Sequence, residues 1–300
     1  MADVVIVGSM ALDTVTTPFG KALNALGGAA TYASYSASFF ARPGVVAIVG
    51  TDFPEKHIET LKKRNINLKG VKREGKTFRW EGVYDYDLNN RETIRIELNS
   101  FENFRPELPE EYRNCRYVFL ANINPELQLN VLQQIRNPKL VVLDTMDLWI
   151  KTKKEALLKV IKKTNILLLN DSEARQLFET PNLLIAAQKA LKMGVDHVII
   201  KKGEHGALLF NAKSHFSAPG YPLEAIKDPT GCGDCFGGAL IGYLAKMNGS
   251  LDDKEIRRAI IYGSVIASYN AEDFSLNRLT ELTKEDIRKR YTEFKSMRTF

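Results

Sequence analysis

Short apolar runs alternate with amphipathic segments along most of the chain. Runs rich in Val, Ile and Leu predict strands, and apolar residues spaced three and four apart predict helices. The predicted strands cover residues 3–8, 45–50, 116–121, 139–144, 165–170, 197–201 and 206–210. The predicted helices lie near 28–40, 54–64, 125–135, 153–163, 172–178, 183–193, 236–246, 253–269 and 284–297. Continuous apolar strands that alternate with helices are typical of a mostly parallel sheet covered on both faces, so we expect an α/β sandwich of three layers.

One segment departs from this alternation. Large apolar residues stand at positions 78, 80, 84, 86 and 88, and after Asn89-Asn90 at positions 94, 96 and 98. A period of two on both sides of a turn predicts an antiparallel hairpin with one apolar face. Two strands cannot bury such a face by themselves, so we expect it to close over a ligand as a lid or to pack on a second subunit. We predict a single domain over 1–300 with an inserted β lid formed by about 72–103 and by 13–20.

Composition and charge exclude several classes of partner. Of the 300 residues 44% are hydrophobic and 26% charged, which is ordinary for a globular protein. Apolar runs stay well short of the roughly 20 residues that span a bilayer. The net charge of +6 is diffuse, and its densest run, 151–163, has the apolar spacing of a solvated helix. We therefore expect neither a membrane nor a nucleic-acid partner, while a mildly basic surface suits an anionic small substrate.

Three cysteines, at positions 115, 232 and 235, cannot build a disulfide framework, which favours a reducing, cytoplasmic location. Cys232-x-x-Cys235 could be a redox pair or half of a zinc site, but the glycines around it fit an anion site better. The four histidines are scattered and show no metal-ligand spacing.

The stretch from Asp228 to Leu240, D-P-T-G-C-G-D-C-F-G-G-A-L, carries the strongest chemical signal. A glycine-rich turn that leads into a helix presents backbone N–H groups and the positive end of the helix dipole, which together favour an anion. Asp234 places a carboxylate at the mouth of this cradle. By itself the stretch leaves two interpretations open, an ordinary helix cap or a catalytic base.

Four further positions are candidates for binding, and each has a structural alternative. Asp13, after the first strand, could accept hydrogen bonds from substrate hydroxyls or cap a turn. Gly27-Gly28 could let a ligand approach the backbone or could open a tightly packed helix. Asn170 and Glu173, where a buried strand ends and a helix begins, could lie at a ligand site or form a capping box. The turn Gly203–Gly206 could border a ligand or be a plain hairpin loop.

In this order and spacing the residues resemble the ribokinase-like (pfkB-type) family of carbohydrate and nucleoside kinases, over essentially the whole chain. The residues from Asp228 to Phe236 are similar to the family signature D-T-x-G-A-G-D-x-F, with Pro229 and Cys232 as variants. Gly8-Ser9 with Asp13, the glycine pair, the N-x-x-E at 170–173, the turn at 203–206 and the inserted hairpin agree as well.

The resemblance implies an ATP-dependent kinase that transfers the γ-phosphate to a primary hydroxyl of a sugar, with a nucleoside kinase and a non-catalytic sugar-binding regulator as alternatives. It makes Asp234 the base and Gly231, Cys232 and Gly233 the anion hole. It assigns the remaining residues to the acceptor (Asp13, Gly27, Gly28, Tyr32), to ATP (Asn170, Lys202, Gly203, Gly206, Thr230, Gly231, Gly233, Asn270), to Mg²⁺ through water (Asn170, Glu173) and, in some members, to an activating monovalent cation such as K⁺ (Asp228, Thr230).

Two departures from the family pattern bear on the acceptor. Tyr32 and Ala11 stand where sugar kinases of the family often have asparagine. Fewer polar groups would then face a sugar, and the aromatic residues of the lid (Phe78, Trp80, Tyr84, Tyr86) could stack on a base or pack in a dimer. A sugar and a nucleoside both remain open, and a homodimer through the lid is expected.

Overall fold

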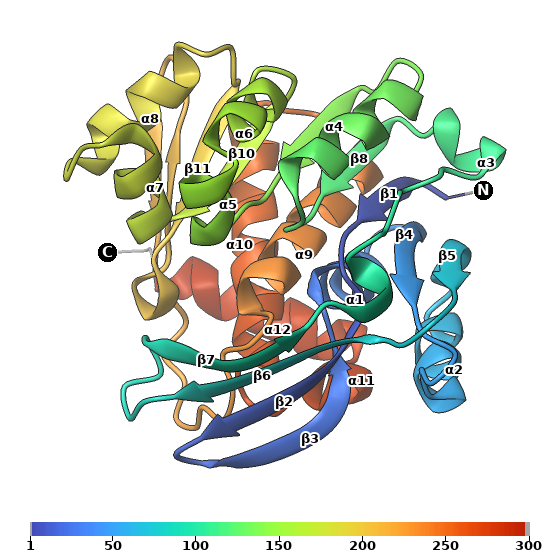
Figure 1. Cartoon of the computed structure of the whole chain (residues 1–300). Helices are drawn as coiled ribbons and strands as arrows, with labels where there is room; N and C mark the ends of the chain where they lie inside the picture. Colours follow the sequence, from blue (N-terminus) through green and yellow to red (C-terminus); the bar gives the residue numbers. More distant parts are fainter. Residues whose placement is uncertain (1, 298–300) are drawn as a thin grey trace.

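A large sheet forms the centre of the computed structural model, which describes residues 2–297. Its strand order is β13-β12-β11-β10-β9-β8-β1-β4-β5, and all neighbours are parallel except the pairs β11–β12 and β12–β13 (Figure 1). The strands are β1 (Val4–Val7), β4 (Pro43–Val49), β5 (Asn67–Arg73), β8 (Tyr117–Leu120), β9 (Leu140–Leu143), β10 (Ile166–Asn170), β11 (His197–Lys201), β12 (Ala207–Phe210) and β13 (His215–Ala218).

Helices cover both faces of this sheet, so the chain has two hydrophobic cores. One core lies under α1 (Ala29–Ala37), α2 (Glu55–Lys63), α9 (Cys232–Lys246), α10 (Asp253–Asn270), α11 (Asn277–Glu281) and α12 (Lys284–Ser296). The other lies under α3 (Glu110–Arg113), α4 (Pro125–Gln134), α5 (Asp147–Thr152), α6 (Lys154–Ile161), α7 (Asp171–Phe178) and α8 (Leu183–Leu191). Alternate residues of β1 enter opposite cores, Val4 and Ile6 one and Val5 and Val7 the other. The predicted three-layer α/β arrangement is confirmed.

A small sheet of four strands, ordered β3-β2-β6-β7, lies beside the main body (Figure 1). It consists of β2 (Ala11–Thr17), β3 (Gly20–Gly27), β6 (Phe78–Tyr84) and β7 (Arg91–Glu97). The strands β6 and β7 are antiparallel, as expected for the hairpin, and β2 joins β6 in parallel. We refer to these four strands as the small sheet.

The sequence analysis missed three strands, and each is an edge. Strands β5 and β13 end the large sheet and β3 ends the small one. An edge strand has one neighbour and is partly solvated, so its sequence lacks the continuous apolar run of a central strand. β3, for example, is GKALNALG, and its first six residues are exposed or half-buried. Among the described residues, none of the helices has the length and apolar character needed to cross a membrane.

Candidate active site

The carboxyl ends of three adjacent strands meet the beginning of α9. Asp144 directly follows β9, Asn170 ends β10, and Lys201 ends β11 opposite Asn170. The ammonium of Lys201 donates to both carboxylate oxygens of Asp144, at 2.8 and 3.0 Å. Sequence reasoning did not single out this ion pair, although both residues end predicted strands, where ligands of parallel sheets collect.

Helix α9 begins four residues earlier than predicted, at Cys232, with Gly231 as its N-cap at φ 78°. The predicted start of this helix near Phe236 was therefore too late, and Cys232 to Cys235 are helical. Later glycines of the stretch serve packing: a Cβ on Gly238 would lie 2.1 Å from the carbonyl oxygen of Ala33 in α1. The N–H groups of Gly233 and Asp234 fall in the first helical turn, where N–H groups have no partner within a helix, so they are available to an anion.

Asp234 lies in this first turn and is half-buried. Loss of solvation raises the pKa of its carboxyl to about 7, and the carboxylate of Asp144 acts in the same direction, while Lys201 and Arg91 oppose the shift. A carboxyl with a pKa near neutrality is well matched to accept a proton from a hydroxyl at neutral pH.

Asp13, in β2, is buried against the glycine pair. A Cβ on Gly27 would lie 1.9 Å from Oδ2 of Asp13, and one on Gly28 would lie 2.5 Å from the carbonyl oxygen of Ser9. The space beside both glycines is thus filled by the chain itself. Burial raises the pKa of Asp13 to about 7; the Gly28 backbone donates to it and opposes the shift, whereas Asp228 and Asp234 reinforce it.

Tyr32 lies beneath the anion cradle. Its ring leaves no room for a side chain at position 231, where a Cβ would come within 2.5 Å of it, and only 2% of Tyr32 is exposed. Gly231 is therefore required both for its positive φ and for this contact. The ring of Tyr32 packs against the Gly231 backbone at the start of α9. The sequence analysis had assigned Tyr32 to the acceptor.

Asn170 and Glu173 form a complete capping box at the start of α7. The Asn170 side chain accepts from the Glu173 N–H, and Glu173 Oε2 accepts from the Asn170 N–H, both at 2.7 Å. The second oxygen of Glu173 is not used in the box. Burial raises the pKa of Glu173 to about 7, with Lys201 opposing and Asp144 adding to the shift. A nearby cation would stabilise the ionised form of this buried carboxyl and lower its pKa.

Asp228, Thr230 and Asn270 converge behind the cradle. Asp228 Oδ1 accepts from the Thr230 N–H at 2.8 Å, and Asn270 donates to the Thr230 carbonyl at 2.8 Å. The remaining oxygens, Asp228 Oδ2 and Asn270 Oδ1, are buried without a hydrogen-bond partner. Buried polar atoms normally have one, so each of these two oxygens is free to contact a cation or a water.

The turn at 203–206 connects β11 to β12. Gly203 and Gly206 have φ of 54° and 84°, and the Lys202 N–H donates to the Gly206 carbonyl at 2.8 Å. A Cβ on Gly203 would lie 3.8 Å from Oδ1 of Asn89, in the turn between β6 and β7. The tip of the small sheet therefore reaches the turn that was predicted to border ATP.

The two thiols of the C-x-x-C lie one helical turn apart in α9. Cys235 is fully buried and Cys232 half-buried. Burial raises the pKa of Cys232 to about 12 and holds the pKa of Cys235 well above its ordinary value. Both are therefore thiols at neutral pH, which disfavours the redox interpretation because thiol exchange needs a thiolate. Among the described residues no group of three or more His, Cys, Asp or Glu side chains is arranged to hold a metal ion.

One face of the small sheet points toward these residues. Asp13 pairs with Trp80, and Trp80 pairs with Ile96, so the three side chains share a face. Farther along the same face, Tyr84 receives a hydrogen bond from the Thr230 hydroxyl at 3.1 Å, and Arg91 lies 5.2 Å from the centre of the Trp80 ring. The face thus carries an acid, an indole and a cation next to the start of α9.

Comparisons with known proteins agree with this geometry. The model of the pfkB family of carbohydrate kinases matches residues 1–281. A cytidine kinase of Thermococcus kodakarensis is 30% identical over 251 residues, which cover 81% of this chain and 89% of that protein.

Solved structures confirm the ribokinase-like fold. A nucleoside kinase of Methanocaldococcus jannaschii superimposes with a TM-score of 0.79 at 21% identity, covering 97% of this chain and 98% of that one. A putative ribokinase II from E. coli, solved in complex with ATP and Mg²⁺, gives a TM-score of 0.79 at 17% identity and covers 98% of this chain and 100% of its own.

Proposed function

We propose that this chain, which belongs to the pfkB family of carbohydrate kinases, is an ATP-dependent kinase that phosphorylates the primary hydroxyl of a nucleoside. That it is a phosphotransferase with a hydroxyl acceptor follows from the family. The nucleoside is the more specific step, and of the two acceptors left open by the sequence it is the one that the small sheet favours. The relative named cytidine kinase supports the same choice.

The observation that carries this choice is the pairing of Asp13 with Trp80. A buried carboxylate is suited to accept hydrogen bonds from the hydroxyls of a ribose. The indole of Trp80, on the neighbouring strand and the same face, offers a flat apolar surface on which a base can stack. Within the chain the indole contacts the Arg91 guanidinium and donates to the Thr93 hydroxyl. A base could stack on it in addition, whereas a free sugar would use only the acid.

The chemistry then rests on a few residues of the chain. Asp234 takes the proton of the primary hydroxyl as its oxygen attacks the γ-phosphorus. The first-turn N–H groups of Gly233 and Asp234 hold the oxygens of the transferring phosphoryl group, whose charge they help to disperse. The turn at Lys202–Gly206 and the buried Asn270 border the proposed ATP site.

Two cations are part of the proposal. The spare oxygen of Glu173 and the raised pKa of this acid fit Mg²⁺ held partly through water, because Mg²⁺ gives up its hydration reluctantly. When bound, Mg²⁺ would neutralise phosphate charge. The unpartnered oxygens of Asp228 and Asn270, beside Thr230, fit a monovalent cation such as K⁺.

The partner of the small sheet is proposed to be a second copy of the chain. Of the eleven exposed large apolar side chains in the described residues, seven lie on the small sheet or at its turns and ends: Phe19, Leu23, Val83, Tyr86, Ile94, Ile96 and Leu98. Sedimentation of the protein and of a Leu23→Asp/Ile94→Asp variant checks this, because the dimer should become monomeric. A wild-type monomer at assay concentrations contradicts it.

The acceptor is tested by measuring turnover with cytidine, uridine, adenosine, ribose and fructose at saturating ATP and Mg²⁺. We expect a pyrimidine or purine nucleoside to give the highest kcat/KM, about 5- to 150-fold above either free sugar, because base stacking adds roughly 1–3 kcal/mol. Trp80→Ala should raise the KM for the nucleoside, while Trp80→Phe should retain most of the affinity.

A matched control is Trp149→Phe, because Trp149 lies in α5, outside the small sheet. This variant should change neither kcat/KM nor the KM for the nucleoside. If a free sugar is the best substrate and Trp80→Ala does not change its KM, the acceptor is a sugar and the nucleoside proposal is wrong. Binding of sugars without any turnover would instead favour the non-catalytic regulator.

A further inference from the structure

The ion pair between Lys201 and Asp144 is buried in the site but plays no part in the mechanism above. The Lys201 side chain is 17% exposed and that of Asp144 5%. Both oxygens of Asp144 are used by the ammonium. An ammonium has three donors, and among the described residues no third acceptor is within hydrogen-bond distance of Nζ.

The ammonium of Lys201 lies against Gly233. A Cβ built on Gly233 would lie 3.2 Å from Nζ of Lys201 and 3.9 Å from its Cε. The ammonium therefore lies at the first turn of α9, against the glycine whose N–H belongs to the proposed anion hole. A side chain at position 233 would stand between the cation and the cradle.

Three acids surround this one cation. Besides Asp144, both Glu173 and Asp234 are close enough for the charge of Lys201 to act on them. Glu173 stands on the side proposed for Mg²⁺ and Asp234 on the side proposed for the acceptor hydroxyl. The ammonium acts on both acids and lies against Gly233 at the anion hole, so a phosphoryl group on its way from ATP to the acceptor would come close to it.

We infer that Lys201 is a catalytic residue that binds an oxygen of the γ-phosphate with its free N–H, and that Asp144 is the positioning residue that holds the ammonium there. The bond from the acceptor oxygen to the γ-phosphorus forms while the bond to the β,γ-bridging oxygen breaks and ADP leaves. The hydroxyl proton goes to Asp234, and Lys201 stays protonated throughout. The role of Lys201 rests on phosphoryl transfer and does not depend on which acceptor is used.

The alternative is that the ion pair only stabilises the carboxyl ends of β9 and β11. The test therefore needs a measurement that would not change if the pair were purely structural. We would titrate MgADP and the magnesium complex of β,γ-methylene-ATP into the wild-type protein and Lys201→Met, without any acceptor. The proposal expects the affinity for the ATP analogue to fall about tenfold or more, with the affinity for ADP changed less than about threefold.

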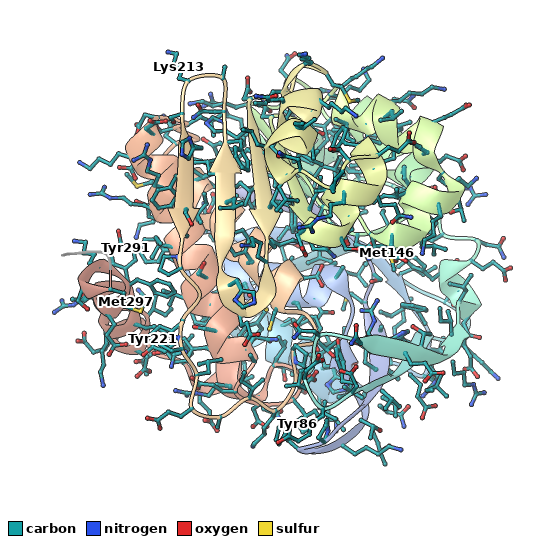
Figure 2. All side chains as sticks on the ribbon, turned by 90° about the vertical axis from the view of Figure 1, so that its left-hand side faces the viewer. Tyr86, Met146, Lys213, Tyr221, Tyr291 and Met297 are labelled. Carbon is teal, nitrogen blue, oxygen red and sulfur yellow. The ribbon has the colours of Figure 1, made fainter. Side chains whose placement is uncertain are left out.

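Lys201→Arg, which keeps the charge, should recover part of the preference for the analogue. In turnover assays Lys201→Met should lower kcat about 10²- to 10³-fold, as expected for loss of one oxyanion-stabilising donor. Lys213→Met is the matched control, because Lys213 lies in the turn between β12 and β13, far from the end of the molecule where Tyr86 marks the small sheet (Figure 2). It should change neither affinity.

Lys201→Met leaves Asp144 as an unpaired buried charge, which is strongly destabilising. If its melting curve shows that it does not fold, the variant Asp144→Asn/Lys201→Met, which removes both charges, takes its place with the same expectations. An equal loss of affinity for ADP and the analogue, or no loss for either, overturns the proposal and leaves the pair a structural role.

Discussion

The carboxylate of Asp13 occupies the space that a side chain at Gly27 would need, since a Cβ there would lie 1.9 Å from Oδ2. Residues 13 and 27 lie on adjacent antiparallel strands, β2 and β3, which places the acid directly against the backbone that leads into α1. The glycine is thus required by the proposed hydroxyl-binding acid. The sequence analysis proposed that Gly27 lets a ligand approach the backbone. In the structure Gly27 instead makes room for Asp13, so a substitution of Gly27 tests the role of Asp13.

Gly27→Ala should displace Asp13 and raise the KM for the acceptor about tenfold or more, with the KM for ATP unchanged. Gly27 does not have a positive φ, so the effect is steric and not a matter of backbone strain. Steady-state kinetics with each substrate varied separately measure it. In the background of Asp13→Ala the same substitution should cost little further, because the clashing carboxylate is gone; equal losses in both backgrounds contradict the coupling.

Asp234→Asn should lower kcat by several orders of magnitude while preserving the fold. The ionised form of this carboxyl is disfavoured in the folded protein, so a neutral replacement should leave the melting temperature at neutral pH unchanged or raised. Turnover and thermal melts measure the two effects. Asp196→Asn, an exposed acid that accepts from Asn165, is the control and should keep full activity. A loss of only a few-fold in Asp234→Asn would remove it as the base.

The pH dependence of kcat/KM should report the raised pKa values of Asp234 and Asp13. Both are about 7, and both carboxyls must be ionised to work, one as base and one as hydroxyl acceptor. Because the two acids act on each other electrostatically, the apparent values belong to the pair. Activity should therefore fall below about pH 7 more steeply than one proton allows, and Asp13→Asn should leave a one-proton slope.

The same shifts fix the sign of a stability effect. A carboxyl whose pKa is higher in the folded than in the unfolded protein stabilises the fold below its unfolded pKa, and this contribution is lost as the pH rises through the folded value. The free energy of unfolding contributed by Asp13 and Asp234 should therefore decrease from about pH 4 to about pH 7. Denaturant titrations across this range should show a shallower decrease in Asp234→Asn, and an unchanged slope contradicts the raised pKa.

Much of this arrangement could be predicted from the sequence, because it depends on local patterns. Central strands can be predicted from continuous apolar runs. The capping box of Asn170 and Glu173 can be predicted from the spacing of the two residues alone. The early start of α9 could not be predicted, because Gly233 and Gly238 are poor helix formers by themselves. Their small size is explained by tertiary contacts: a Cβ on Gly238 would lie 2.1 Å from the Ala33 carbonyl oxygen, and one on Gly233 would lie 3.2 Å from Nζ of Lys201. Both contacts join residues far apart in the chain.

The Lys201–Asp144 pair and the Asp13–Trp80 pairing were missed for the same reason. Each depends on which strands become neighbours and in which register. A single sequence carries no record of that choice. Position at a strand end was the one available signal for Lys201 and Asp144.

The last prediction concerns the C-x-x-C. Cys232→Ala/Cys235→Ala should keep kcat within a few-fold of the wild type, with and without reductant. The Cys232 thiol contacts the Ala267 carbonyl and the Asn270 amide at 3.4 and 3.6 Å, so neither contact is with a proposed reacting atom. The double variant should lose some stability, on the order of 1 kcal/mol per buried sulfur, because each substitution leaves a small cavity in a packed helix. Turnover before and after treatment with diamide, together with denaturant unfolding, separates the two effects. Loss of activity beyond about a hundredfold with the fold intact would restore the redox interpretation of this stretch.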